Sequence, residues 1–160
     1  MDFDFTPYFE KYEKLVTASD AAFNRVKNAH ADCVTCTAGC ADCCHAVFDL
    51  TLIEALYINH RYLHKFQEAE KTDIEERANR ADRQMTKIKR WAHQELLAGK
   101  PEAEILVELA RERVRCPLLN TQDLCDLYEN RPLTCRFYGI PTAIGGTGRT
   151  CGKSDFKEGE

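Results

Sequence analysis

Five cysteines lie within a short stretch near the start of this sequence, at a spacing typical of metal ligands. They follow the pattern C-x2-C-x3-C-x2-C-C, at Cys33, Cys36, Cys40, Cys43 and Cys44. A two-residue gap lets a tight turn direct two thiolates at one ion, and both tetrahedral zinc and iron–sulfur clusters are held in this way. The pattern predicts a metal site without naming the metal.

Four further cysteines follow later in the chain, at Cys116, Cys125, Cys135 and Cys151. The sequence around them is rich in proline and glycine and has little periodicity, so short turns and at most one-turn helices are expected there. Such a segment has few means of burying itself, and metal ligation would supply the missing constraint. We therefore expect the 33–44 loop and the 116–151 turns to form one irregular metal-binding region.

The adjacent pair Cys43 and Cys44 poses a separate geometric question. Neighbouring side chains alternate in a strand and diverge by about 100° in a helix, so the two thiols should point in different directions. We expect that they do not serve one mononuclear site together. Either they reach different sites, or one ligates while the other lies behind it. Nine cysteines would suffice for two four-ligand sites with one left over.

Charge and cysteine content limit the class of protein. The formal net charge of -4 gives no general attraction to nucleic acid or anionic lipid, and no uninterrupted apolar stretch is long enough to span a bilayer. The amino terminus has acidic residues where a secretion signal needs basic ones. We therefore expect a cytoplasmic protein with no nucleic-acid or membrane partner, in which reduced thiols bind metal rather than form disulfides.

The elements that must position the cysteines read as helices. Apolar residues recur at steps of three and four over about 6–28, and Thr51 and Glu54 have the spacing of a capping box at the start of a helix reaching about Phe66. A long charged helix is expected over about 72–97, ended by Gly99 and Pro101, and a shorter helix should start near Pro101. The sequence thus predicts a mainly α protein, a small helical bundle in a single domain over 1–160. We interpret residues 145–148 as a flexible turn that follows no clear strand.

Two blocks of residues carry a resemblance to a known family. The first is CADCCH at 40–45, followed by LTLIEA at 50–55. The second is Cys116-Pro117, then CDLYENRPLTCR at 125–136. Together they resemble the CxxCxxCC cysteine-cluster family of zinc- or iron-chelating, YkgJ-like proteins. Against that family, the helical stretch over 66–115 looks like an insertion.

The resemblance implies metal-ligand roles for six cysteines, and the remaining three are candidates on other grounds. The six are Cys40, Cys43, Cys44, Cys116, Cys125 and Cys135. The resemblance supports Cys36 less directly, because three residues rather than two separate it from Cys40. Cys33 and Cys151 are assigned from proximity and count alone. The family has no settled reaction, so the resemblance defines the site more than the function.

Three residues near Cys135 are candidates for contact with a bound cofactor. Arg131 and Arg136 flank this cysteine, and their guanidinium groups could offset the negative charge of a thiolate-bound metal centre. The alternative is an ordinary salt bridge to Asp126 or Glu129. Tyr128 could donate a hydrogen bond to cluster sulfur, or simply pack under a loop.

Three functions are consistent with these residues. The first hypothesis is an iron–sulfur protein with a [4Fe–4S] cluster, acting in electron transfer, redox sensing or modification chemistry together with a redox partner. The second is a zinc-binding structural or interaction module whose long charged helix contacts a protein partner. The third is storage of Cu(I) or another metal, since soft thiolates also suit copper. The sequence does not decide whether the protein is an enzyme.

Overall fold

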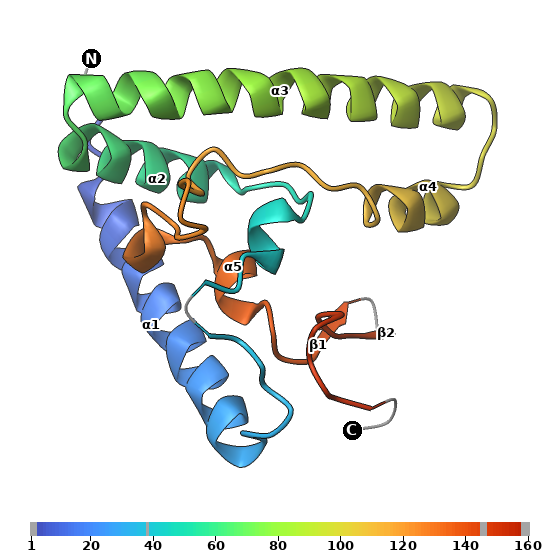
Figure 1. Cartoon of the computed structure of the whole chain (residues 1–160), viewed down its shortest axis with the longest axis horizontal. Coiled ribbons are helices and arrows are strands. Elements are labelled where there is room, and N and C mark those ends of the chain that lie inside the picture. Colours follow the sequence, from blue (N-terminus) through green and yellow to red (C-terminus); the bar gives the residue numbers. More distant parts are fainter. Residues whose placement is uncertain (1–2, 38, 145–146, 158–160) are drawn as a thin grey trace. The chain divides into compact units, whose positions relative to one another are not determined.

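The computed structural model describes residues 3–37, 39–144 and 147–157, and it is mainly helical, which confirms the predicted fold class (Figure 1). Its α-helices are α1 (Thr6–Ala29), α2 (Leu52–Lys65), α3 (Glu68–Leu97), α4 (Glu102–Leu109) and α5 (Leu133–Phe137). Two short 3-10 helices, η1 (Asp42–His45) and η2 (Tyr128–Asn130), lie between them. The cysteines lie in loops and short helical turns, and none lies on α1, α2, α3 or α4.

The chain divides into two compact units. The first consists of Met1–Ala38, Leu50–Arg61 and Glu129–Glu160, and the second consists of Gly39–Asp49 and Tyr62–Tyr128. Each unit joins segments that are distant in the sequence. The expectation of a single domain with an insertion over 66–115 stays a prediction.

In the first unit, α1 packs against α5 and against the early part of α2 (Figure 1). Arg136 of α5 is 4% exposed and donates two hydrogen bonds to the Asp20 carboxylate on α1, at 2.9 and 2.7 Å. The Tyr57 ring of α2 lies edge-on to two aromatic rings of α1, 5.0 Å from Tyr12 and 5.4 Å from Phe9. Such ring pairs add to the burial of apolar surface that holds helices together.

The predicted capping box at the start of α2 is present and also reaches α5. The Glu54 carboxylate accepts hydrogen bonds from the Thr51 N–H at 2.9 Å and from the Thr51 hydroxyl at 2.7 Å. Its other oxygen accepts the Leu133 N–H at 2.9 Å, at the first residue of α5. Because a helix start has unsatisfied N–H groups, this buried carboxylate satisfies donors of two helices at once.

A β-hairpin follows α5, which corrects the sequence analysis. Strands β1 (Thr142–Ile144) and β2 (Thr147–Arg149) pair antiparallel, with Thr142 opposite Arg149. The predicted flexible turn over 145–148 therefore gives way to a strand at Thr147 and Gly148. Gly145 and Gly146, which were part of that prediction, lie outside the described residues. A Gly-Gly pair between two short runs is a hairpin signal that apolar periodicity does not contain.

In the second unit, α3 and α4 form an antiparallel helical hairpin (Figure 1). The long helix begins at Glu68 rather than near Thr72, because Gln67 and Glu70 form a capping box there. It ends at Leu97 as predicted, and Gly99 follows with a φ of +87°, a conformation that favours glycine. The Lys100 ammonium then binds carboxylates on both helices, Glu95 at 3.1 Å and Glu108 at 2.7 Å.

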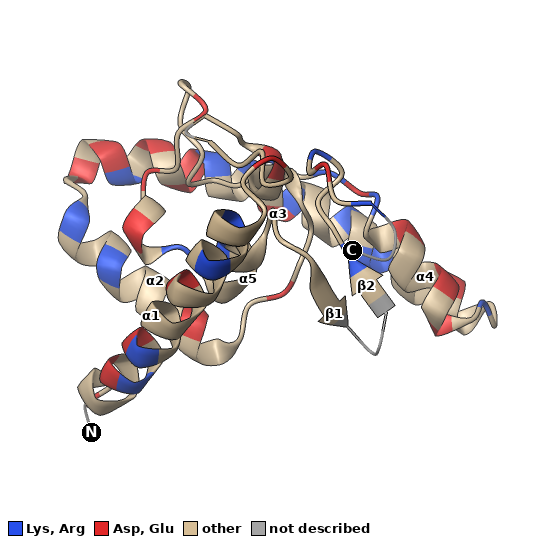
Figure 2. Ribbon diagram, turned by 90° about the horizontal axis from the view of Figure 1, so that it is seen from below, with Lys and Arg blue, Asp and Glu red and all other residues tan. Residues whose placement is uncertain are grey.

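The charged residues are distributed along the helices rather than gathered into one basic face. Figure 2 shows Lys and Arg interspersed with Asp and Glu along α1, and acidic residues on α4. Within the described residues, no helix combines the length and apolar character needed to cross a membrane.

Candidate metal centre

Main-chain hydrogen bonds bring two cysteine segments of the second unit together. The Cys116 N–H donates to the Cys44 carbonyl at 2.7 Å, and the Val114 N–H donates to the His45 carbonyl at 3.0 Å. The 3-10 helix η1, which carries Cys43 and Cys44, is thereby held against the segment leading into Cys116. Cysteines that lie more than seventy positions apart in the sequence are thus neighbours in the fold.

Cys125 is returned to the same region by a tight reversal of the chain. Leu119 and Cys125 form an antiparallel β-bridge, so the chain folds back directly after Cys116. Arg77 of α3 fixes this reversal by donating to the Leu119 carbonyl at 2.8 Å and to the Asp126 carboxylate at 3.2 Å. Cys116 and Cys125 therefore lie on the two arms of one reversal.

The neighbouring sulfur atoms of Cys43 and Cys44 lie 4.0 Å apart. The expectation that these side chains point in different directions is wrong, because the tight backbone of η1 places them side by side instead of alternating them. Four thiolates at about 2.3 Å from a tetrahedral zinc ion would have sulfur atoms about 3.8 Å apart. The observed separation is close to that value.

Backbone N–H groups near Cys116 and Cys125 favour the thiolate form of these two cysteines. The N–H groups of Leu118 and Leu119 form hydrogen bonds that lower the pKa of Cys116, and the Leu127 N–H acts in the same way on Cys125. A donor two or three residues after a cysteine stabilises its thiolate, which is the form that binds metal. The local backbone is therefore arranged for thiolate at these two positions.

Other effects oppose ionisation of these thiols. Burial is the largest cause and raises the pKa of both Cys116 and Cys125 above the ordinary value. The pKa of Cys44 is raised by its hydrogen bond with Cys43, by burial and by the charges of nearby cysteines. A cation close to such thiols offsets this effect and favours the thiolate form of all of them. A metal ion supplies that charge.

Cys40 and His45 flank the cysteine pair in the same unit. Cys40 lies in the loop before η1 and is half-buried. The His45 Nδ1 lies 3.0 Å from the Ala41 carbonyl oxygen, so an Nδ1–H donor there leaves Nε2 available as a ligand. The second unit thus holds five thiols and one imidazole close to η1 and its partner segments.

The remaining four candidate cysteines lie in the first unit. Cys33 and Cys36 belong to the loop after α1, Cys135 lies on α5, and Cys151 follows β2. The structure thus divides the nine thiols into a group of five and a group of four. Each group combines early and late cysteines of the chain.

The candidate cofactor contacts near Cys135 have different surroundings. Arg136 is held by the Asp20 carboxylate and by the carbonyls of Arg131 and Glu129, so its salt bridge is to Asp20 rather than to Asp126 or Glu129. Tyr128 is 55% exposed in η2. A cofactor role for Arg131, Arg136 and Tyr128 stays a prediction.

Arg77 is a basic residue near the thiols that sequence reasoning missed. Its charge lowers the pKa of Cys116, and it lines a cavity of about 340 Å³ together with Arg80, Arg115 and Cys116. Positive charge beside a thiolate centre offsets the negative charge of that centre. Nothing in the sequence distinguishes Arg77 from the other charged residues of α3, because its neighbours come from the distant segment after Cys116.

The cysteine side chains would have to change conformation to ligate a metal ion together. In the part of the chain that the structure describes, no group of three or more Cys, His, Asp or Glu side chains is arranged to hold a metal ion as it lies. A change of one cysteine rotamer moves its sulfur by roughly 3 Å. Main-chain contacts bring together the segments that carry Cys44, Cys116 and Cys125.

The fold and the thiol groups define a helical protein with a cysteine-rich metal centre. A family model matches residues 35–152, which is most of the chain, and is described as "CxxCxxCC: Putative zinc- or iron-chelating domain". The chain belongs to this family of metal-binding proteins. No curated protein and no solved structure matches it.

Proposed function

We propose that the protein binds a [4Fe–4S] cluster through the thiols of its second unit and uses the cluster in a redox role. The ligands are drawn from Cys40, Cys43, Cys44, Cys116 and Cys125. The main observation in support is that this unit joins five thiols from two distant segments, two of them with backbone N–H donors. Hydrogen bonds to sulfur and nearby charge are among the factors that set the potential of such clusters.

Three features favour iron–sulfur chemistry in this unit. Five thiols are one more than the four cysteines that hold a [4Fe–4S] cluster, so the group can hold a cluster and keep a further thiol beside it. Arg77 contributes positive charge next to Cys116, where a cluster with four thiolates carries net negative charge. The thiols are also only partly exposed, which limits oxidation of a cluster.

A single zinc ion is the second candidate for this unit. The 4.0 Å separation of the Cys43 and Cys44 sulfur atoms favours it, since that distance is close to the edge of a tetrahedral thiolate site. Such a site would hold η1 to the Cys116 segment without redox chemistry. Cu(I) or metal storage is a third, lesser candidate, for which the structure offers no specific support.

Anaerobic purification followed by metal analysis tests the first proposal. A cluster predicts brown protein with about four irons and four sulfides per chain, and loss of both in Cys116→Ser and Cys125→Ser. Colourless wild-type protein with stoichiometric zinc at the same thiols would end the iron–sulfur proposal and support the zinc site.

The cellular context is also a proposal. We place the protein in the cytoplasm, where reduced thiols persist and where an electron-transfer protein could serve as its redox partner. A protein partner bound through α3 stays a prediction.

A further inference from the structure

A polar cavity lies in the second unit, between α3 and the segment that runs back from α4 (Figure 1). Its volume is about 340 Å³, at the lower end of the range of small-molecule sites. Arg77, Arg80 and Gln84 line it from α3, and Arg115 and Thr121 line it from the later segment. The three residues of α3 are spaced by three and four positions, so they share one face of the helix. The cavity thus gathers arginines from two segments that are distant in the sequence.

The wall of this cavity carries positive charge without acidic side chains. Of the described residues that line it, none is Asp or Glu, and the others are uncharged polar or small apolar residues and Cys116. The nearby carboxylates pair with the arginines from positions outside the lining. An anion in the cavity would therefore meet guanidinium groups, whose paired N–H donors match the oxygen atoms of phosphate and carboxylate.

Arg77 is a fixed part of this wall. Its side chain is 15% exposed, and it donates to the Leu119 carbonyl and to the Asp126 carboxylate, with Asp73 as a further partner at 3.2 Å. Its Nε is buried and has no hydrogen-bond partner within the described residues. A buried donor without an acceptor costs free energy. The fold thus holds this cation in place and leaves one of its donors unsatisfied.

Arg80 and Arg115 are more exposed and less firmly held. Arg80 is 59% exposed, and its carboxylate partner, Glu76, is 4.0 Å away. Arg115 is 44% exposed, and the hydrogen bonds that it makes to the Asn120 carbonyl and the Asp123 carboxylate both use Nη2. Exposed ion pairs contribute little to stability. Both guanidinium groups can therefore turn toward a ligand at small cost.

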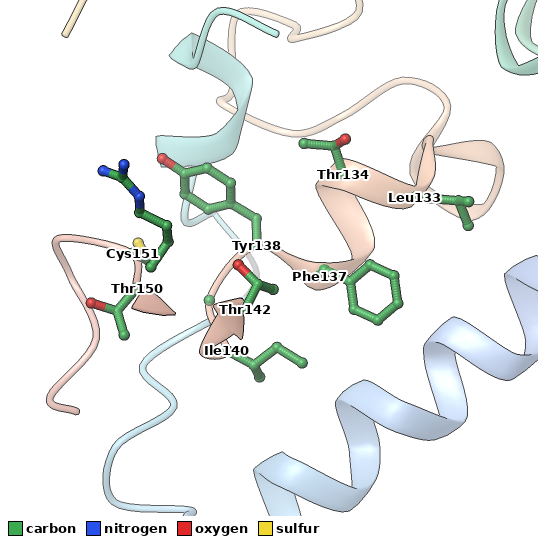
Figure 3. Close-up of a pocket in the computed structure, with 10 residues that line it drawn as sticks. Leu133, Thr134, Phe137, Tyr138, Ile140, Thr142, Thr150 and Cys151 are labelled. Atoms are coloured by element: carbon green, nitrogen blue, oxygen red, sulfur yellow. The ribbon is translucent and has the colours of Figure 1, made fainter. Parts of the chain in front are cut away.

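The cavity of the first unit differs in character. Its volume is about 420 Å³, and of the described residues that line it, Arg149 alone is an arginine or a lysine. Figure 3 shows the apolar side chains of Leu133, Phe137 and Ile140 among its lining residues. It does not offer the set of arginines that the second unit gathers, so Arg149 is a suitable control for the effect of charge alone.

From this arrangement we propose that Arg77, Arg80 and Arg115 bind a small organic dianion, one that carries a phosphate group or two carboxylates. The volume leaves room for more than the anionic group itself, and amide and hydroxyl side chains in the wall add hydrogen-bonding groups. Because Cys116 also lines the cavity, the ligand lies beside the thiols of this unit. The inference goes beyond the proposed cluster and does not depend on which metal those thiols bind.

Arginine modification in the wild-type chain tests the site. Full-length protein, purified without oxygen, is treated with phenylglyoxal, and the modified arginines are identified by peptide mass spectrometry. The probes are glycerol phosphate and succinate, each at about ten times its dissociation constant and at constant ionic strength, because salt screens surface charge. We expect at least one probe to slow modification of Arg80 and Arg115 by about tenfold. Arg83 and Arg149, which do not line this cavity, should react at an unchanged rate. The probe that protects shows whether the site takes phosphate, dicarboxylate or both.

Calorimetric titration of four variants gives a second readout. Arg80→Gln and Arg115→Gln should each weaken binding of the protecting probe by about tenfold or more, because each removes charge-assisted hydrogen bonds. Arg83→Gln and Arg149→Gln remove the same charge elsewhere and should weaken it by less than about twofold. Circular dichroism checks that the variants are folded, which is expected because the substituted side chains are exposed.

Two results would overturn the anion site. One is that neither probe binds the wild-type protein at millimolar concentration, and the other is that all four substitutions weaken binding equally. Iron and sulfide content, measured in the same preparations, reports separately on the thiols of the second unit. The anion site and the cluster can therefore each fail alone.

Discussion

The buried carboxylate of Glu54 offers a sharp test of how the fold positions Cys135. It accepts hydrogen bonds from the Thr51 N–H, the Thr51 hydroxyl and the Leu133 N–H. In Glu54→Gln, one oxygen becomes an NH2 group, which faces either the Thr51 donors or the Leu133 N–H. At least one buried N–H then lacks an acceptor, and such a loss costs about 1–3 kcal/mol.

Urea unfolding of the full-length chain at neutral pH measures this effect. We expect Glu54→Gln to lower the free energy of unfolding by about 2 kcal/mol. Glu70→Gln is the matched control, because Glu70 caps α3 through a single exposed hydrogen bond and glutamine can serve in the same capping box. A loss in Glu54→Gln no larger than in this control would refute the proposed double role of Glu54.

Three further predictions follow from individual residues. Gly139→Ala should lower the free energy of unfolding by roughly 1–3 kcal/mol, because Gly139 has a positive φ and an added Cβ would clash with the Cys36 sulfur. Gly152→Ala should change the free energy of unfolding little, because the space around Gly152 is open. Equal effects of the two substitutions in urea unfolding would contradict the role given to the φ and the clash at Gly139. Burial raises the pKa of Tyr12 to about 12, so between pH 10 and 12 the unfolded chain releases this proton while the folded chain retains it. The contribution of Tyr12 to stability is therefore fully present below pH 10 and is lost as the pH rises toward 12, by at most about 2.7 kcal/mol. The free energy of unfolding, measured against pH, should decline less steeply in Tyr12→Phe than in the wild type. An unchanged slope would contradict the raised pKa of Tyr12. For a cluster in the second unit, Arg77→Gln should make the reduction potential more negative, since it removes positive charge near Cys116. Arg80 is more exposed than Arg77, so Arg80→Gln should shift the potential less. Redox titration measures both shifts, and Arg77→Lys, which keeps the charge, should leave the potential close to that of the wild type.

Much of the fold could be predicted from the sequence because its helices carry strong local signals. The apolar periodicity of α1, the Thr51–Glu54 capping box and the Gly99 stop are all local, and the structure contains each of them. The hairpin after α5 was missed because its strands are too short to show periodicity.

The candidate site was harder to predict in detail. The residue types and the spacing at 33–44 indicate metal, but the division of thiols between the units depends on distant pairings such as Cys44 with Cys116 and Cys33 with Asp155. The direction of the Cys43 and Cys44 side chains depends on a 3-10 turn that a helix-or-strand analysis does not anticipate. The contribution of Arg77 likewise arises from tertiary contacts alone.

Metal and sulfide analysis with electron paramagnetic resonance, on protein prepared without oxygen, shows directly whether the thiols of the second unit hold a cluster. We expect thiolate-bound metal in the wild type, with about four irons and four sulfides per chain and a spectrum from the reduced cluster, and we expect the cluster and its spectrum to be lost in Cys116→Ser. Wild-type protein whose Cys43, Cys44, Cys116 and Cys125 all stay reactive and metal-free after anoxic incubation with iron, sulfide and zinc would contradict it.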